Sequence, residues 1–553
     1  MKTQLKRTVC FLIAAIMILS LAACGGGSSN SGAAPSGSAA PAPQQQTGGD
    51  PNYIKVNIAA PQDPGNYLPF GADNSVRSTF SCYVYEQLFK VIDAPDGLIP
   101  CIATDYTREE DGTAGIYTVH IHDNIYDTAG EHITASDVAF CFNKILENGE
   151  RQNTYGELKP VEAVDETTVR LTIDPDQLGT FERVVTATDI VSQKSYEASK
   201  TGFSSDPIGS GPYYIGEWIP GSSIQFLKNE NYWAKDLGFD NQNCDEIFVK
   251  FIAEPAQATI EMETGGVDFA YHISTKDAAN FEGVPGYAII NNPFVQIRCI
   301  GFNCDETNVF SDLRLRQAVC YAVDAEALVQ AVYDGKGGAP TVMAVPEPAG
   351  GYTFDYDPKW NERDIPYAYN PEKAKELLAE AGYPNGGLKV RLMTKDNPEY
   401  RSAAEIIQAY CAQVGIEIEI NAIENALYQT YRFQPETFDL QICQWANNSQ
   451  PYIPCGYKWY MNRNPETGKN VMFQNDDEMQ RRLEAALDFD THSLETVGEL
   501  IDYVVLDTCC MYPYAYTLNN YVHVDTITDP VMAQGIVFHP ELSHFADNWA
   551  RHS

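Results

Sequence analysis

The sequence predicts an α/β protein built from two or more lobes, and three observations support this fold class. Short segments that place an apolar residue at every second position indicate β-strands. Segments with apolar residues three and four positions apart, each preceded by a helix-capping residue, indicate α-helices that alternate with the strands. About 500 residues follow a low-complexity N-terminal stretch, which is more than one hydrophobic core normally holds together.

The chain begins with a short export signal. Three basic residues precede an almost wholly apolar run over residues 9–21, which has the length of a signal-peptide core and is short for a membrane span. The run ends in Leu-Ala-Ala-Cys, a pattern that resembles the lipobox of bacterial lipoproteins. We therefore expect a lipoprotein signal peptide over residues 1–23 and a diacylglycerol group on the thiol of Cys24. The alternative interpretation is an ordinary secretory signal followed by a chance cysteine.

A flexible linker is expected after the signal. Residues 25–49 are Gly, Ser, Ala, Pro and Gln with one Asn and one Thr. Such a stretch cannot bury enough apolar surface to offset its chain entropy, so it should stay disordered. We expect residues 24–50 to form the lipidated cysteine and a disordered linker. Two acyl chains hold a protein stably on a bilayer, so the body would be anchored at the extracytoplasmic face of the cell membrane.

Composition narrows the classes of partner. The formal net charge of −38 argues against binding nucleic acid and against binding anionic lipid through a basic patch. Of the 14 cysteines, Cys10 and Cys24 belong to the leader, which leaves 12 in the body. Their spacing fits no disulfide scaffold, and no CxxC pair indicates a zinc site. We expect many of them to be free, buried thiols.

The body alternates strands and helices in chain order. Strands are expected at residues 54–58, 117–121 and 168–173. A helix is expected after Thr134, where Asp137 three residues later completes a capping box. Two further helices are expected after the capping residues Asp324 and Asn370.

Six segments of the body carry short motifs. They are residues 132–138 (HITASDV), 206–213 (DPIGSGPY), 228–233 (KNENYW), 265–268 (GGVD), 312–324 (DLRLRQAVCYAVD) and 369–384 (YNPEKAKELLAEAGYP). In this order they resemble segments of the solute-binding proteins of peptide and nickel ABC transporters, the extracytoplasmic family 5 group. The motifs are mostly structural: we expect Arg314 and Arg316 to tie a helix end to nearby carboxylates rather than to contact a ligand.

The resemblance implies a two-lobed fold of the periplasmic-binding-protein type, in the large form that binds dipeptides and oligopeptides. Lobe one would comprise residues 51–299 plus 511–553, and lobe two residues 300–510. The chain would cross the hinge twice, and the ligand would lie between the lobes, which close on it.

The resemblance also implies where a ligand would bind. In the family's peptide binders a segment of the form W..D supplies an aspartate for the peptide's α-ammonium group. Here Trp445 matches the tryptophan, but Asn448 stands at the aspartate position, and an amide cannot neutralise a cation. Together with Asn447, these side chains would suit sugar hydroxyls or an amine-blocked peptide as well, and a plain turn before Pro451 is the structural alternative.

Two further segments are candidates by their position in the family. Asp73, Asn74 and Ser75 match a segment that runs along the ligand in peptide binders, and Asp73 could replace the missing carboxylate. Tyr514 and Tyr516 match the returning hinge strand, and strand alternation predicts that they share one face.

The function implied is a substrate-binding lipoprotein of an ABC importer, which would deliver an oligopeptide, or alternatively an oligosaccharide, to a permease. A sensor with the same fold is a further alternative. An exported hydrolase is a third, but the sequence lacks a Gly-x-Ser-x-Gly elbow, a His-Glu-x-x-His motif and a P-loop. Some relatives carry nickel chelates; a half-exposed strand accounts for His120 and His122, and we expect neither a metal site nor a cofactor.

Overall fold

The structure is a computed structural model. It describes residues 53–71, 79–90, 98–149, 151–237, 242–335, 367–446, 452–461, 470–474, 476–533, 537–540 and 543–545, together with residues 338, 355, 357, 359, 360 and 463. All of these residues belong to one compact unit, Pro51–Ser553. Among the helices within these ranges, none combines the length and the apolar composition that crossing a membrane requires.

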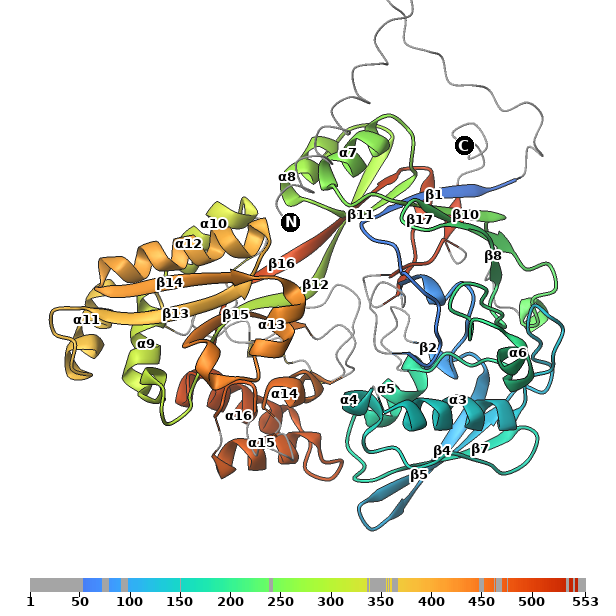
Figure 1. Cartoon of the computed structure of the whole chain (residues 1–553), viewed down its shortest axis with the longest axis horizontal. Helices are drawn as coiled ribbons and strands as arrows, with labels where there is room; N and C mark the ends of the chain where they lie inside the picture. The colour runs from blue at the N-terminus through green and yellow to red at the C-terminus, as the bar shows by residue number, and fades with distance from the viewer. Residues whose placement is uncertain are drawn as a thin grey trace, which may run out of the picture. The chain divides into compact units, whose positions relative to one another are not determined.

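A ten-stranded mixed sheet is the main framework of the body (Figure 1). Its strands, in spatial order, are β14 (Ile416–Ile423), β13 (Leu388–Lys395), β15 (Leu440–Ala446), β12 (Tyr287–Phe302), β16 (Met511–Val524), β11 (Phe269–Ile273), β1 (Lys55–Ala60), β10 (Glu246–Phe251), β9 (Ser223–Lys228) and β8 (Tyr213–Ile219). This mixture of parallel and antiparallel strands, with helices on both sides, confirms the predicted α/β class.

Two long central strands connect the two halves of this sheet. β12 and β16 are antiparallel and pair from Tyr287 opposite Val524 to Gly301 opposite Met511. At one end β16 pairs with β11, and at the other end β12 pairs with β15. The chain therefore passes between the halves once in each direction, as Figure 1 shows.

Lobe one adds a smaller sheet and several helices. The sheet runs in the order β4 (Ala103–Asp111), β5 (Ala114–Ile121), β7 (Thr168–Ile173) and β6 (Glu162–Ala163). The helices are α3 (Ala135–Asn148), α4 (Gln152–Tyr155), α5 (Thr180–Ala187), α6 (Gln193–Ala198), α7 (Pro255–Glu263) and α8 (Thr275–Ala278). Short pairs complete it: β2 (Phe89–Lys90) with β3 (Ile99–Pro100), β17 (Ile527–Asp529) with β20 (His544–Phe545), and β18 (Met532–Ala533) with β19 (Val537–Phe538).

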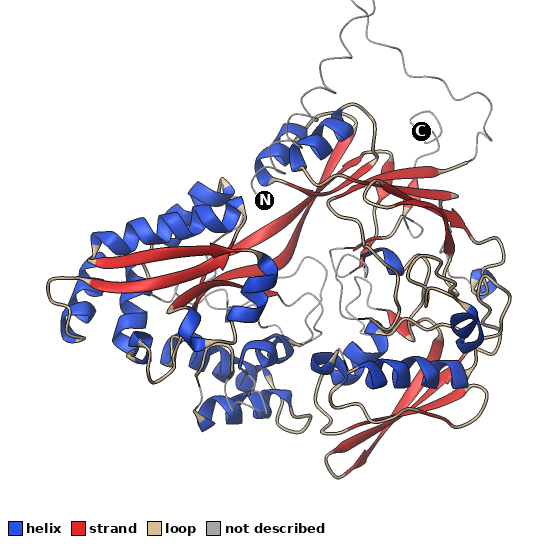
Figure 2. Ribbon diagram, viewed as in Figure 1, coloured by secondary structure: helices blue, strands red, loops and turns tan. Residues whose placement is uncertain are grey.

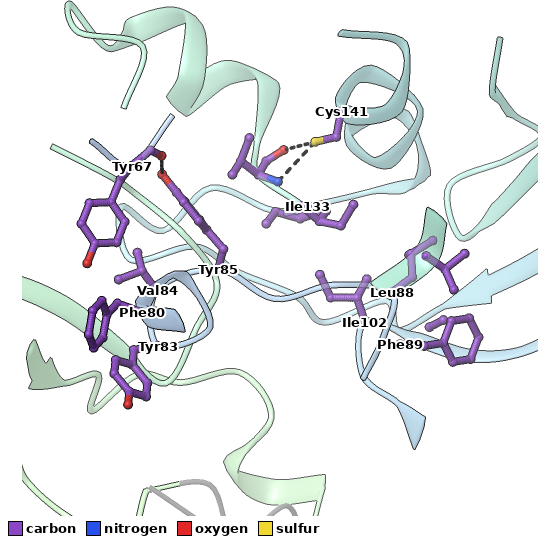
Figure 3. Close-up of a cluster of buried hydrophobic side chains, with 14 of the residues drawn as sticks. Tyr67, Phe80, Tyr83, Val84, Tyr85, Leu88, Phe89, Ile102, Ile133 and Cys141 are labelled. Atoms are coloured by element: carbon purple, nitrogen blue, oxygen red, sulfur yellow. Dashed lines mark hydrogen bonds between the residues drawn. The ribbon is translucent and has the colours of Figure 1, made fainter. Parts of the chain in front are cut away.

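The core of lobe one is rich in tyrosine. Figure 3 shows Tyr67, Phe80, Tyr83 and Tyr85 in this buried cluster. The hydroxyl of Tyr85 donates a hydrogen bond to the carbonyl of Tyr67 at 3.0 Å. Much of the chain's tyrosine content therefore fills the core, where each ring needs a partner for its hydroxyl group.

Lobe two is a sheet covered by helices on both faces (Figure 2). One face packs against α9 (Leu313–Ala322), α10 (Ala325–Tyr333), α11 (Pro371–Glu380) and α12 (Pro398–Gln413). The other packs against α13 (Asn425–Tyr431), α14 (Ile453–Met461), α15 (Asp477–Leu487) and α16 (Leu494–Asp502). β12 from Ile297 onward and β16 up to Tyr516 pack within these clusters. The lobe boundaries themselves stay a prediction.

Single-turn segments complete the list of elements: 3₁₀ helices at Lys235–Leu237, Ala279–Phe281, Val309–Ser311 and Pro435–Thr437, and a π-helical turn at Tyr503–Asp507.

The local predictions about strands and caps are confirmed. β1, β5 and β7 lie where the period-two segments predict them. Thr134 and Asp137 form the capping box of α3, and the side chains of Asp324 and Asn370 cap α10 and α11. All 12 cysteines of the body are free thiols in the structure, and ten of them are buried.

Candidate functional site

Most of the ligand-contact residues predicted from the sequence lie in segments that the structure does not describe. Outside the described residues lie Cys24, Asp73, Asn74, Ser75, Asn447 and Asn448. The backbone of Trp445 is described: it lies near the end of β15 and pairs with Ile297 of β12. The ligand roles of these residues stay predictions.

The structure differs from the prediction for Tyr514 and Tyr516. Arg298 of β12 pairs with Ala515, but the next residue, Cys299, pairs with Pro513, so Tyr514 is the extra residue of a β-bulge. Tyr514 is fully buried in the cluster beneath α9–α12, whereas Tyr516 packs against the cluster on the opposite face. The same-face prediction is therefore wrong, because the bulge shifts the alternation by one residue.

The carboxyl edge of the lobe-two strands is the place where polar side chains gather. β13, β14 and β15 run parallel and end at Lys395, Ile423 and Ala446. The antiparallel strand β12 brings Arg298 opposite Gln444 at this same edge, and from there β12 leads into lobe one. In open α/β sheets, ligands bind outside the carboxyl ends of the strands, which makes this edge the candidate site.

Three cations meet at this edge, and we call them the cationic cluster: Arg298, Lys395 and Arg432. The Arg298 guanidinium lies 5.1 Å from the ring centroid of Tyr400, and the Lys395 ammonium lies 5.4 Å from the same centroid. Arg432, which follows α13, lies 5.0 Å from the ring of Tyr460. Each cation thus contacts an aromatic face, which is a favourable arrangement.

Hydrogen bonds hold the rings and one cation in place. The hydroxyl of Tyr400 donates to Oε1 of Gln444 at 3.0 Å, and that of Tyr460 donates to the carbonyl of Gln444. Nε of Arg298 donates to Oε1 of Glu399 at 2.7 Å. Arg298 is therefore fixed by a carboxylate on the first turn of α12.

The electrostatics of the cluster follow from burial and from like charges. Burial lowers the pKa of Lys395, and the neighbouring cations Arg298 and Arg432 lower it further. Burial also raises the pKa of Tyr460 to about 12, which keeps its hydroxyl group protonated at neutral pH. Three cations therefore lie near one another at this edge, and among the described residues Glu399 pairs with Arg298.

Sequence reasoning missed the cationic cluster. Its three members lie more than 30 residues apart in the chain and carry no motif. A signal was available, because an alternating run over residues 388–392 precedes Lys395 and a helix-capping Asn397–Pro398 pair follows it, which together indicate the end of a strand. Nothing local to Arg298 or Arg432 distinguishes them from other arginines.

Contacts also join the two lobes directly. The Lys458 ammonium of α14 lies 2.7 Å from Oε1 of Glu157 and 2.8 Å from Oε1 of Gln177 in lobe one. The backbone N–H of Leu178 donates to the carbonyl of Leu487 at 2.9 Å. These bonds require the lobes to be in contact.

Among the described residues, no group of three or more His, Cys, Asp or Glu side chains could hold a metal ion. Nδ1 of His120 lies 2.6 Å from Oδ1 of Asp105, and the ring of His122 lies 5.3 Å from that of Trp233.

Curated proteins of similar sequence include two bacterial binding proteins. Among curated proteins, heme-binding protein A of Haemophilus influenzae is 27% identical over 378 residues, which cover 63% of this chain and 66% of that protein. Glutathione-binding protein GsiB of Escherichia coli K12 is 26% identical over 361 residues, covering 64% of this chain and 67% of that protein. The chain spans about two thirds of the length of these curated relatives.

Solved structures share the fold over nearly the whole body. The oligopeptide-binding protein AppA of Bacillus subtilis, in complex with a nonapeptide, superposes with a TM-score of 0.72 at 20% identity, over 89% of this chain and 99% of that one. NikA of Brucella suis, in complex with Fe(III)-EDTA, gives a TM-score of 0.74 at 20% identity over the same shares. At this identity the likeness establishes the fold alone, and it confirms the two-lobed periplasmic-binding-protein architecture.

A family model covers the larger part of the sequence. The model of the middle region of family 5 of the bacterial extracellular solute-binding proteins matches residues 97–465, more than half of the chain. This range includes all six motif segments in full, most of both lobes, and all three members of the cationic cluster. The chain belongs to family 5 of the bacterial extracellular solute-binding proteins, as its motifs predict.

Proposed function

We propose that this protein is the substrate-binding component of an ABC importer, which captures a peptide-like solute between its lobes and delivers it to a permease. Its membership of family 5 carries the proposal. The name of one relative describes glutathione binding, and a structural neighbour holds a nonapeptide, so peptide-like solutes are the class supported best. The protein would act by binding alone, without turnover of its ligand.

Lobe closure is the mechanism that this architecture supports. β12 and β16 form the double connection between the lobes, and a ligand held by both lobes would shift the equilibrium toward the closed form. Contacts such as that of Lys458 with Glu157 would add to the stability of that form. The closed surface is what a permease would recognise.

An oligosaccharide is the second candidate solute. Asn447 and Asn448 stand beside Trp445, and amides next to an indole ring suit sugar hydroxyls and the apolar face of a pyranose. Asp73, Asn74 and Ser75 would line the same cleft from lobe one, together with Tyr516. Tyr514 is fully buried in the structure and would support the hinge strand rather than contact the solute.

The first experiment is native mass spectrometry of the full chain purified in detergent, followed by thermal-shift assays with peptide and oligosaccharide libraries. A bound solute raises the melting temperature by mass action. A co-purifying peptide, or a melting shift with peptides alone, supports the proposal. A shift with oligosaccharides alone supports the second candidate, and steady turnover of either library would contradict a binding function.

Trp445→Ala tests the assignment of the cleft. Loss of a buried aromatic contact should weaken solute binding by about 1–3 kcal/mol without unfolding the body. Val164→Ala is the control, because this side chain is 49% exposed and should leave affinity unchanged. Titration calorimetry measures the solute affinity of the parent protein and of both variants. If all three affinities are equal, the solute does not bind at the end of β15.

We also propose that Cys24 carries the lipid that anchors the protein at the extracytoplasmic face of the cell membrane. The lipobox-like Leu-Ala-Ala-Cys supports this proposal. Cys24→Ser should abolish incorporation of an alkynyl fatty acid and release the protein from the membrane fraction. Retention of the label by this variant would refute acylation at Cys24.

A further inference from the structure

Two buried thiols of lobe two face each other although 189 positions separate them in the chain. Sγ of Cys320, on α9, lies 3.4 Å from Sγ of Cys509, which lies two residues before β16. Both side chains are fully buried in the cluster beneath α9–α12. The sulfurs of a disulfide are about 2.05 Å apart, so these two atoms need to approach by only about 1.4 Å to reach bonding distance.

Hydrogen bonds fix the backbone on both sides of Cys509. The carbonyl of Thr508 accepts a hydrogen bond at 2.9 Å from Nε of Arg316, which lies one turn before the other cysteine on α9. The carbonyl of Cys510 accepts a hydrogen bond at 3.0 Å from the N–H of Phe302. Cys509 itself has a φ of 46°, a left-handed conformation that a residue other than glycine keeps only where its surroundings enforce it. The close approach of the two sulfurs therefore comes from a backbone that its neighbours hold in place.

The structure also distinguishes Cys509 from the cysteine next to it. Cys510 is buried in the cluster on the opposite face of the sheet, so its thiol does not share the surroundings of Cys320. Adjacent cysteines also have a poor geometry for bonding each other. Cys411 of α12 lies in the same cluster as Cys320 and is the competing partner that a test must exclude.

We propose that Cys320 and Cys509 are a redox-active pair that a disulfide oxidant such as glutathione disulfide converts into a disulfide bond. One thiolate of the pair attacks glutathione disulfide, which forms a mixed disulfide and releases a glutathione thiolate. The second cysteine then attacks the protein sulfur of the mixed disulfide and displaces the other glutathione thiolate. In sum, the two protein thiols lose two electrons and two protons, and one glutathione disulfide becomes two glutathione thiols. This inference does not depend on which solute the protein binds.

Burial decides when this exchange takes place. Burial raises the pKa of the Cys320 thiol, and the contact with Cys509 raises it further, so little thiolate forms while the protein stays folded. The exchange therefore needs the chain to be folding or locally open. Export, which is proposed above, would bring the folding chain into a compartment where disulfides persist. Once the fold closes over the bond, a reductant reaches it as poorly as the oxidant reached the thiols.

The bond would tie α9 to the start of the returning strand β16. The loop that it closes contains α10–α16 and β13–β15, which is most of lobe two. A cross-link over so long a loop removes conformations from the unfolded chain. The oxidised protein should therefore melt about 5 °C or more above the reduced protein.

The test starts from the full chain with all of its thiols reduced. The protein is incubated with a mixture of reduced and oxidised glutathione in urea at the onset of unfolding, where brief openings expose buried thiols, and is then returned to buffer, alkylated and digested. Peptide mapping should show Cys320 joined to Cys509 and the other ten of the 12 body cysteines alkylated. Alkylation of all 12, glutathione adducts without a cross-link, or a bond from Cys320 to another cysteine such as Cys411 would overturn the inference.

Two variants separate this pair from its neighbours. Cys510→Ala is the matched control, because its side chain packs on the opposite face and the cross-link should still form. Cys509→Ala should leave Cys320 as an alkylated thiol. Oxidation should raise the melting temperature of the parent and of Cys510→Ala by about 5 °C or more and leave that of Cys509→Ala unchanged. An equal rise in all three proteins would show that the oxidised site lies elsewhere and would contradict the inference.

Discussion

Burial sets the ionisation of individual side chains in this protein. Asp355 is only 2% exposed, and both of its carboxylate oxygens accept hydrogen bonds from the backbone N–H of Ile453, at 2.9 and 3.2 Å. His492 approaches it to 4.0 Å. Burial outweighs these contacts and raises the pKa of Asp355 to about 6.

Asp355→Asn should therefore stabilise the protein in a pH-dependent way. An unfolded aspartate ionises near pH 4, so ionising the folded one costs stability as pH rises from about 4 to about 6. The variant should gain about 2 kcal/mol in the free energy of unfolding at pH 7.5 and nothing at pH 4. Urea unfolding at both pH values measures this, with the exposed Asp477→Asn as control. If Asp355→Asn is less stable than the parent at pH 7.5, the ionised Asp355 carboxylate does not destabilise the fold and the prediction is wrong.

Burial also protects the thiols. It raises the pKa of Cys101 and Cys411 to about 12, so the reactive thiolate is scarce at neutral pH. Of the 12 free cysteines, Cys82 and Cys304 are half-buried and the others are buried.

A thiol count with an aromatic disulfide reagent tests whether the cysteines are free and buried. Native protein should react slowly and mainly at Cys82, whereas unreduced protein in guanidinium chloride should release about 12 equivalents from the body. A count near zero after denaturation would show that the cysteines form disulfides.

At the scale of elements, one helix is tied to the strand that returns to lobe one. Arg316 of α9 is buried, and its guanidinium donates to the carbonyls of Thr508, Phe310 and Ser311 at 2.9, 2.5 and 3.1 Å. Thr508 lies just before β16. The expectation of a carboxylate partner is correct for Arg314, which pairs with Asp312, but Arg316 uses backbone carbonyls instead.

Substitution of these two arginines should have very different effects. Arg316→Met leaves buried carbonyls without donors and should lower the free energy of unfolding by about 3 kcal/mol. Arg314→Met removes an exposed ion pair and should change it by at most about 0.5 kcal/mol. Thermal and urea unfolding compare the two, and equal losses would show that the buried guanidinium adds nothing specific.

At the scale of the whole molecule, few described hydrogen bonds and ion pairs join the lobes apart from the connecting strands β12 and β16. Lys458 of α14 contacts Glu157 and Gln177 of lobe one, and the Cys455 thiol donates to the carbonyl of Leu178 at 3.2 Å. These contacts form only while the lobes touch, so under the proposed mechanism they would favour the closed form.

Lys458→Met should shift the equilibrium toward the open form. Loss of a half-buried charge pair should weaken solute affinity by about 3- to 10-fold, entirely through the open–closed equilibrium. Small-angle scattering should show a larger radius of gyration for the empty variant. The exposed Lys373→Met serves as control. An unchanged affinity together with an unchanged radius would mean that these contacts do not bias closure.

Much of the fold could be predicted from local sequence. Local patterns predict the strands β1, β5 and β7 and the caps of α3, α10 and α11. Each of these features depends on residues within a few positions of one another, so the sequence alone indicates it. The ordered series of motifs was likewise sufficient to predict the family and the two-lobed architecture.

The candidate site depended on long-range pairing. The bulge at Tyr514 arises where β16 pairs with β12, some 200 residues away in sequence. It places Tyr514 and Tyr516 on opposite faces of the sheet. The cationic cluster exists because parallel strands end at one edge and an antiparallel strand brings Arg298 to the same level. The sequence by itself determined many of the elements and the family. Only the tertiary structure decided which charges share a site, because strand register is set between segments and not within them.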